Sequence, residues 1–309
     1  MTLAEATKAL ADLQKKMYAL NHATGIIYLD SVTVAPEDTA VGRGETLGIL
    51  SGFSYELFAN PQTEELLKFL AEHRDELTMQ QAREVEMLTR DYERISKIPQ
   101  DEYVEYQKLI NEAQSVWHRA KKENDFPAFA PYIEKIAAAN RKFAGYFNPG
   151  KHPYNVTLDH YERGLTMEKL DVFFGKLRET IVPLLHRIRN EAEQVDDSFL
   201  HQEFPVEQQR KLSDYLMEVM AIDRRHCGIG ETEHPFTINF NKYDVRITTK
   251  YHTDSITSSM YSVIHEGGHA LYELGTADEL MYTCLAAGIS MGVHESQSRL
   301  FENIIGRSE

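Results

Sequence analysis

The stretch from residue 264 to residue 271 constrains this chain most, because it contains the pattern His-Glu-x-x-His at His265, Glu266 and His269. Residues four apart on a helix share a face, with Cβ atoms about 5–6 Å apart. Two imidazoles spaced in this way can bind one metal ion, typically zinc. Glu266 could accept a proton from a water molecule that the metal activates. The pattern therefore requires a helix and predicts a metal site on it.

The flanking sequence independently predicts this helix. Thr257 and Ser258 are suitable N-cap residues, and Gly275 is a suitable end. Gly267 and Gly268 oppose the prediction, because each costs a helix about 1 kcal/mol relative to alanine. Close approach of a substrate or of another backbone would explain both glycines. The apolar residues at helical spacing are Met260, Val263, Ile264, Leu271 and Leu274.

A catalytic zinc site needs a third protein ligand, and a carboxylate from a later helix is the best candidate. Residues 291–302 have helical spacing and contain Glu295. The alternative interpretation of Glu295 is a surface ion pair with Arg299, four residues further on. Glu302 shares a face with Glu295 and is the second candidate ligand. Glu273 is less suitable, because it lies one turn beyond the second histidine on the same helix.

Composition and charge exclude several classes of protein. The 309 residues are 42% hydrophobic and 26% charged, which is ordinary for a globular protein. The net charge of −15 argues against nucleic acid or an anionic membrane as the main partner. No apolar run approaches the ~20 residues of a membrane span, and the first residues do not form a signal peptide. Two cysteines without metal-binding spacing favour a cytoplasmic location.

The first 220 residues predict a series of helices without internal repeats, so the expected fold class is mainly α. A capping box at Thr2 and Glu5 starts the first helix, and Pro183 is expected to kink a long one. The expected helices cover residues 2–20, 63–76, 78–98, a stretch ending near 122, 131–147, 166–193 and 205–220.

Beyond residue 220 the pattern changes, and residues 237–240 and 243–250 predict a hairpin. Period two places Asp244, Arg246 and Thr248 on one side of the second strand. This side is either the polar face of an edge strand with an Asp–Arg pair, or a wall of the active site where Arg246 binds a carboxylate. His234 has the same two interpretations: a packed histidine, or a group that lines a substrate cleft.

Four motifs in a fixed order give the chain a resemblance to a known family. Together they resemble the Taq-type thermostable metallocarboxypeptidases, and the resemblance covers the whole chain. The motifs are His234-Pro-Phe236, Asp244-Val-Arg246-Ile-Thr248, His265-Glu-Gly-Gly-His269 and His294-Glu295-Ser-Gln297.

The resemblance implies a multi-helical, zincin-like metallopeptidase with a small antiparallel hairpin or sheet beside the active-site helix. It implies that His265, His269 and Glu295 bind one Zn²⁺ or Co²⁺ per chain, with Glu266 as the general base. Such an enzyme removes C-terminal residues from peptides with a free C-terminus, and its full-length form is a homodimer. The residues implied in substrate binding are His234, Asp244, Arg246, Thr248 and His294.

The chain lacks two later motifs of that family. We therefore expect a single domain over residues 1–309 that is incomplete at its C-terminus, with a helical region (1–220) and a metal-site region (221–309). Two alternatives stay open. One is an endopeptidase or oligopeptidase of the same metal class, and the other is a non-catalytic helical binding module.

Overall fold

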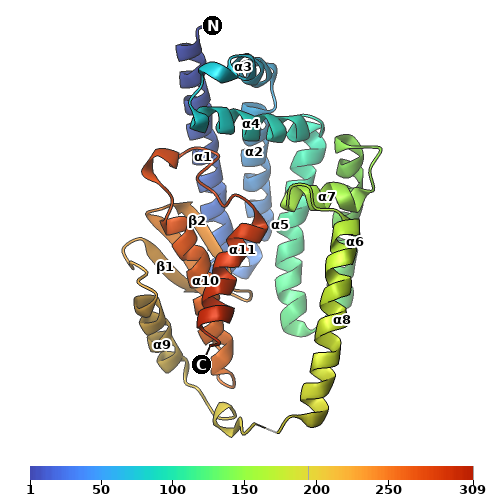
Figure 1. Cartoon of the computed structure of the whole chain (residues 1–309). Coiled ribbons are helices and arrows are strands. Elements are labelled where there is room, and N and C mark those ends of the chain that lie inside the picture. The colour runs from blue at the N-terminus through green and yellow to red at the C-terminus, as the bar shows by residue number, and fades with distance from the viewer. Residues whose placement is uncertain (194, 309) are drawn as a thin grey trace.

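The structure is a computed structural model that describes residues 1–193 and 195–308, and it is mostly helical with a small sheet (Figure 1). The mainly α prediction is confirmed. The N-terminal helices are α1 (Leu3–Thr33), α2 (Ala40–Phe58), α3 (Pro61–Glu72), α4 (Met79–Ile95), α5 (Gln100–Glu123), α6 (Phe126–Phe147), α7 (Pro153–Tyr161) and α8 (Met167–Glu191). The C-terminal helices are α9 (Val206–Val219), α10 (Ile256–Leu274), α11 (Met291–Arg299) and the π-helical turn η5 (Leu300–Ile305).

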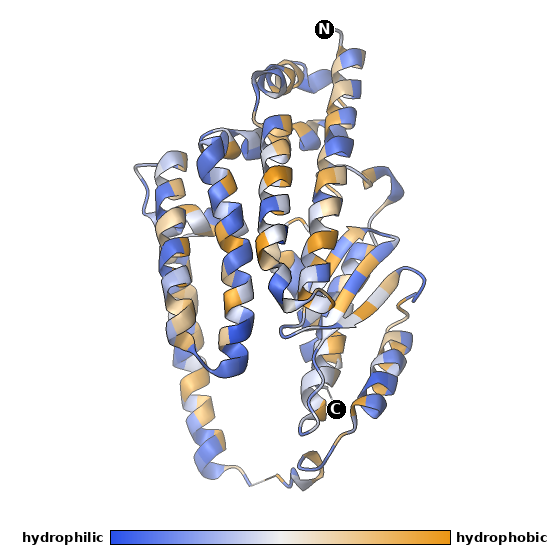
Figure 2. Cartoon of the chain, turned by 180° about the vertical axis from the view of Figure 1, so that it is seen from behind, coloured by the Kyte–Doolittle hydropathy of each residue, from blue (hydrophilic) through white to orange (hydrophobic). Residues whose placement is uncertain are grey.

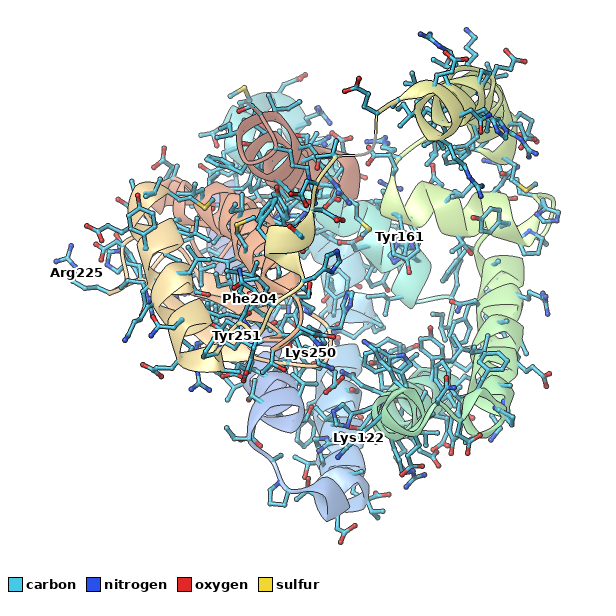
Figure 3. All side chains as sticks on the ribbon, turned by 90° about the horizontal axis from the view of Figure 1, so that it is seen from below. Lys122, Tyr161, Phe204, Arg225, Lys250 and Tyr251 are labelled. Carbon is cyan, nitrogen blue, oxygen red and sulfur yellow. The ribbon has the colours of Figure 1, made fainter. Side chains whose placement is uncertain are left out.

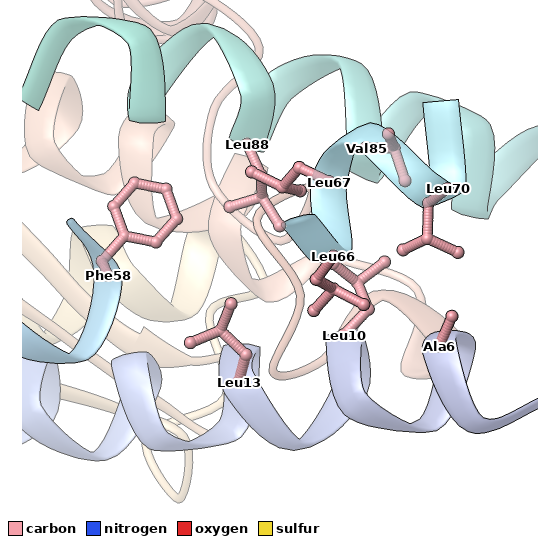
Figure 4. Close-up of a cluster of buried hydrophobic side chains, with 9 residues drawn as sticks. All are labelled: Ala6, Leu10, Leu13, Phe58, Leu66, Leu67, Leu70, Val85 and Leu88. Carbon is pink, nitrogen blue, oxygen red and sulfur yellow. The ribbon is translucent and has the colours of Figure 1, made fainter. Parts of the chain in front are cut away.

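The first helix starts as predicted and forms one side of a hydrophobic core. The Thr2 side chain accepts a hydrogen bond from the Glu5 backbone N–H, and the Glu5 carboxylate accepts one from the Thr2 backbone, which completes the capping box. Side chains from α1, α2, α3 and α4 then pack together (Figure 4). The buried members of this cluster are Ala6, Leu10, Leu13, Phe58, Leu66, Leu67, Leu70, Val85 and Leu88.

Helix α2 was not predicted, because its glycines lower helix propensity. The structure shows what these glycines allow. Gly44 and Gly48 are buried, and a Cβ atom on Gly48 would lie 2.8 Å from Cε of Lys108 in α5. Small residues at these positions let α2 and α5 pack closely, and this packing outweighs the low propensity.

The predicted hairpin is confirmed, and a third strand joins it. Strands β2 (Thr237–Asn241) and β3 (Asp244–Thr249) pair antiparallel, and β1 (Cys227–Glu231) pairs with β3 in parallel. The strand order is β1-β3-β2 over the residues that the structure describes. Strand β1 was not predicted, because its Cys-Gly-Ile-Gly sequence is poor in β-branched and aromatic residues. The sheet is therefore mixed, beyond the antiparallel hairpin that was expected.

A second core joins this sheet to α9 and α10. Its fully buried side chains include Met217 of α9, Val245 and Ile247 of β3, and Val263 of α10. Hydrogen bonds reinforce the packing, because the buried Gln209 of α9 accepts one from Ser259 of α10 at 2.6 Å. Figure 3 shows the labelled side chains of Phe204 and Tyr251 on this side of the molecule. This core fixes α10 against the sheet.

Helix α8 lies at the edge of the molecule, below α7 (Figures 1 and 2). It continues through Pro183 as a single helix. Many of its apolar side chains are exposed, and we call them the α8 apolar face. Its members are Val172, Phe173, Phe174, Leu177, Ile181, Val182, Leu184, Leu185 and Ile188.

Over residues 1–193 and 195–308, no helix combines the length and the apolar character that crossing a membrane requires.

Candidate metal centre

The centre forms where α10 and α11 cross in close contact. Gly268 of α10 lies against the backbone of α11, and a Cβ atom there would be 2.7 Å from Cα of Ser298. This contact confirms one of the two explanations predicted for the glycines, the approach of another backbone. Gly267 faces a different neighbour, since its Cβ atom would lie 2.7 Å from Cε of Met220. The close crossing brings the side chains of the two helices together.

His265, His269 and Glu295 meet at this crossing. Their ligand atoms all lie within 4.8 Å of one another, and they are the one such group of three among the residues that the structure describes. Oε2 of Glu295 is 3.2 Å from Nε2 of His269 and 3.6 Å from Nε2 of His265. The three residues that were predicted as ligands from the sequence are therefore adjacent in space.

This donor set fits a divalent metal. Two imidazole nitrogens and one carboxylate oxygen form the His₂Glu set that catalytic zinc sites use, and three protein ligands leave a position open. All three side chains are partly buried. The buried environment lowers the pKa of His269 to about 4, with the neighbouring His294 and His265 as further causes. The imidazole is therefore neutral at pH 7, which is the state that binds metal.

Glu295 is held by its own helix. Ser298 donates a hydrogen bond to its Oε2 at 2.9 Å, and Arg299 donates one to its Oε1 at 2.7 Å. Burial, the largest single cause, would raise the pKa of Glu295, but these hydrogen bonds together with the nearby charges of His265 and Arg299 outweigh it, and the pKa is lowered. The ion pair with Arg299, predicted as an alternative to a ligand role, therefore coexists with the position beside the histidines.

Glu266 is buried between α10 and β2. The Thr237 hydroxyl lies 2.7 Å from Oε2 of Glu266 and 3.0 Å from its backbone carbonyl. Burial is the main cause that raises the pKa of Glu266, and the hydrogen bond from Thr237 opposes it. A carboxylate with a raised pKa is suited to accept and return a proton near neutral pH.

The outer nitrogens of the two histidines also have partners. Nδ1 of His265 is 2.9 Å from Oε2 of Glu302, which lies in the π-helical turn. Nδ1 of His269 is 2.5 Å from Nδ1 of His294, and Nε2 of His294 is 2.6 Å from Oε1 of Glu273. Glu302 and His294 therefore contact the sides of the two histidines that face away from Glu295, and Glu273 contacts His294 behind them.

The residues of the Asp-x-Arg-x-Thr motif lie on β3. Arg246 donates two hydrogen bonds to Asp244 at 2.7 and 2.8 Å, and its guanidinium stacks over Phe240. The predicted Asp–Arg pair is therefore present. Thr248 is buried, and its hydroxyl accepts a hydrogen bond from the Phe236 backbone N–H at 2.9 Å. Thr248 thus fixes the segment that leads into β2.

His234 lines a cavity of about 1170 Å³ between α1, α2, α5 and the segment before β2. Phe236 also lines it, and the next residue is Thr237, which binds Glu266. Lys122, labelled in Figure 3, enters the lining from α5. His234 therefore faces a large hollow that adjoins the segment carrying Thr237.

Sequence reasoning missed two residues of the centre, Thr237 and Asn239. Both lie on β2, two residues apart, and both contact α10: Asn239 donates a hydrogen bond to Glu273 at 2.6 Å. The period-two pattern of polar side chains could have identified this face of the strand. The face predicted from the sequence was that of β3 alone, and β3 lies in the middle of the sheet.

Comparisons with known proteins find similarity over almost the whole chain. The family model described as carboxypeptidase Taq (M32) metallopeptidase matches residues 9–309. Carboxypeptidase 1 of Bacillus subtilis (strain 168) is 36% identical over 302 residues, which is 98% of this chain and 60% of that protein. Thermostable carboxypeptidase 1 of Thermus thermophilus is 32% identical over 320 residues, covering 100% of this chain and 62% of that protein.

Solved structures are similar over the same range. The crystal structure of BsuCP superposes with a TM-score of 0.96 at 36% identity, covering 98% of this chain and 61% of that one. Metallocarboxypeptidase 1 of Trypanosoma cruzi gives a TM-score of 0.86 at 30% identity, with 98% and 61% covered. The chain thus spans about 60% of the length of the curated relatives that it matches.

Proposed function

The chain belongs to the carboxypeptidase Taq (M32) metallopeptidase family, and from this membership we propose that it carries the metal centre of a carboxypeptidase. The proposed reaction is hydrolysis of the last peptide bond of a peptide with a free C-terminus. The observation that carries the proposal is the meeting of His265, His269 and Glu295 within 4.8 Å beside the buried Glu266.

The family implies a divalent metal, and we propose Zn²⁺ or Co²⁺ held by these three residues, one ion per chain. When bound there, the ion would act as a Lewis acid toward water and the scissile carbonyl. Nε2 of His265 and Nε2 of His269 both lie near Oε2 of Glu295, so the donors already converge on one point.

Glu266 is the proposed general base. Its Oε2 accepts a hydrogen bond from the Thr237 hydroxyl, and this bond fixes the carboxylate on the side of α10 that faces β2. The raised pKa of Glu266, caused mainly by burial, makes it a stronger base than an exposed glutamate. In the proposed reaction Glu266 takes a proton from water and then gives it to the leaving amine.

We propose that the peptide approaches through the cavity that His234 lines. Phe236 in its lining is next to Thr237, and this connection supports a route from the cavity to Glu266. Asp244, Arg246, Thr248 and His294 are the other proposed substrate-side residues. Arg246 would supply the cation for the terminal carboxylate, although its Nε and one Nη already bind Asp244.

We further propose a cytoplasmic enzyme that is a homodimer in its full-length form. Cys227 and Cys284 are both free thiols, and burial raises their pKa to about 11 and about 12. Reduced, unreactive cysteines are in keeping with a reducing compartment. The α8 apolar face supports an association surface.

The test uses one short peptide in two forms, with a free and with an amidated C-terminus. Each is incubated with the zinc-loaded or cobalt-loaded chain, and the products are measured by mass spectrometry. Stepwise loss of residues from the free form alone is the expected result. Internal cuts in both forms would instead support the endopeptidase alternative. Absence of cleavage by metal-loaded protein would contradict the proposal for this chain, and absence of bound metal would favour a non-catalytic binding module.

A further inference from the structure

Two buried carboxylates near the centre have no part in the proposed reaction. The side chain of Glu302 is 11% exposed and that of Glu273 is 5% exposed. Burying a carboxylate is costly unless hydrogen bonds satisfy it, so both groups need a reason to be buried. Glu302 contacts His265 directly, and Glu273 contacts His294, which in turn contacts His269.

We infer that Glu302 orients His265, and that Glu273 orients His269 through His294, so that both histidines present a bare Nε2 to Glu295. This inference rests on the proposed metal centre and extends it to its supporting residues. In this assignment Glu302, Glu273 and His294 are positioning residues that do not contact the metal. Glu302, the second candidate metal ligand from the sequence, is here a positioning residue instead. His294, which the resemblance implied in substrate binding, has this positioning role as well.

The first pair sets the proton of His265. An ionised carboxylate only accepts hydrogen bonds, so the 2.9 Å contact with Oε2 of Glu302 requires the proton on Nδ1 of His265. In the neutral ring, Nε2 is then the unprotonated nitrogen, and it lies 3.6 Å from Oε2 of Glu295. The hydrogen bond of one ring nitrogen thus decides which nitrogen can bind metal.

Glu302 is itself held in place on both oxygens. Arg307 donates to its Oε1 at 2.8 Å, and Arg299 donates to its Oε2 at 3.1 Å. Arg307 in turn stacks on Tyr261 of α10, with 3.7 Å between the guanidinium carbon and the ring centre. Glu302 lies in the π-helical turn that follows α11, and such turns are frequent at functional sites.

The second arrangement is a relay of three side chains. Glu273 accepts hydrogen bonds from Asn239 at 2.6 Å and from Nε2 of His294 at 2.6 Å. A neutral His294 that donates from Nε2 can only accept at Nδ1. Nδ1 of His269, at 2.5 Å, is then the donor, and its Nε2 remains bare 3.2 Å from Oε2 of Glu295.

The His294 ring has little room to turn away from this relay. A Cβ atom on Gly288 would lie 2.5 Å from Cδ2 of His294, so the Gly288 backbone packs directly against the ring. On α10, Tyr272 packs against the same ring at 4.9 Å between centres.

Two independent arrangements therefore produce the same tautomer in the two histidines. Carboxylates that accept the second N–H of metal-binding histidines change metal affinity by about 10–100-fold when removed.

The test begins with metal-free protein whose histidines are labelled with ¹⁵N. Long-range ¹H–¹⁵N correlation spectra report which ring nitrogen carries the proton, and single histidine substitutions assign the signals. The expected result is the Nδ1-protonated tautomer for both His265 and His269. The Nε2-protonated tautomer in either ring would overturn the inference without any effect on the proposed function.

Metal affinity is the second readout, measured by zinc or cobalt competition with a chromophoric chelator. Glu302→Gln and Glu273→Gln are expected to weaken binding by about 10–100-fold each and to change the visible spectrum of bound cobalt. Glu84→Gln is the matched control, because Glu84 is equally buried but hydrogen-bonds Gln14 and Gln80. A merely structural role would lower the unfolding temperature of all three variants and leave zinc affinity unchanged.

These measurements distinguish a failure of the positioning inference from a failure of the proposed function. If the parent chain binds zinc and the Glu302 and Glu273 variants bind it equally well, the positioning inference is wrong and the proposed centre stands. If the parent chain binds neither metal, the proposed function fails and no metal-directed role remains for these residues.

Discussion

The Thr237 hydroxyl lies 2.7 Å from Oε2 of Glu266 and is its hydrogen-bond donor across the boundary between β2 and α10. This bond lowers the pKa of Glu266 against the larger, opposite effect of burial. Thr237→Val removes the donor and keeps the shape of the side chain. The pKa of Glu266 should therefore rise further.

A general base works only when it is deprotonated, so activity falls as the pH drops through its pKa. A higher pKa of Glu266 moves this acidic limb to higher pH. The pH profile of kcat/KM for peptide hydrolysis should accordingly shift upward in Thr237→Val. Thr237→Ser keeps the hydroxyl and should follow the parent. An unshifted profile in the valine variant would mean that another group controls the acidic limb.

Glu266→Gln should separate metal binding from hydrolysis. The amide keeps the size of the side chain and cannot accept a proton, so we expect a loss of about 10²–10⁴-fold in kcat. Zinc content after dialysis should match that of the parent, because Glu266 is not one of the proposed ligands. Hydrolysis at the parental rate would show that the base is wrongly assigned.

Gly268→Ala should disrupt the centre through packing alone. The new methyl group would meet the backbone of α11 at Ser298, which cannot move as a flexible side chain can. Overpacking of this kind typically costs about 1–3 kcal/mol, and here it would also push Glu295 away from the histidines. Chemical denaturation and zinc affinity should both report the change.

Gly175→Ala is the control for this glycine. Gly175 lies within α8 and has no heavy atom within 4 Å of an added Cβ, so alanine should stabilise the helix by up to about 1 kcal/mol. If Gly268→Ala behaved in the same way, the close contact between α10 and α11 would not be needed for the site.

The α8 apolar face should bind hydrophobic probes and promote association. Phe173 and Leu185 are 58% and 57% exposed, so Phe173→Gln with Leu185→Gln should cost little stability. We expect the double variant to lower the fluorescence of a bound naphthalene sulfonate dye and to reduce the mass measured by light scattering at high concentration. Glu179→Gln on the same helix changes charge without adding or removing apolar surface, and should leave the dye signal unchanged.

The proximity of the three proposed ligand residues could be predicted because their pattern is encoded at short range. The spacing of His265 and His269 on one helix is a local property, and Glu295 lies within the next helix. The residues that hydrogen-bond to this centre could not be predicted in the same way. Thr237 reaches Glu266 from a strand, and Glu302 reaches His265 from a π-helical turn, so only tertiary packing brings them together.

Glycine limited the prediction of the fold in a similar way. Helix α2 and strand β1 were missed because glycine is unfavourable in both elements by local propensity. In the structure, Gly48 leaves room for the side chain of Lys108 of α5, and Gly228 of β1 pairs with Arg246 of β3. The benefit of these glycines comes from neighbours that are distant in sequence, which a local pattern does not contain.

The two helices of the centre are joined by residues 275–290. An ion bound to His269 and Glu295 would close this connection into a ring, as a removable cross-link does. After a protease cut within the connection, the ion would still hold the two fragments together, and a chelator would remove this link. An ion bound at the crossing of α10 and α11 would therefore hold two parts of the chain together, in addition to its proposed role in hydrolysis.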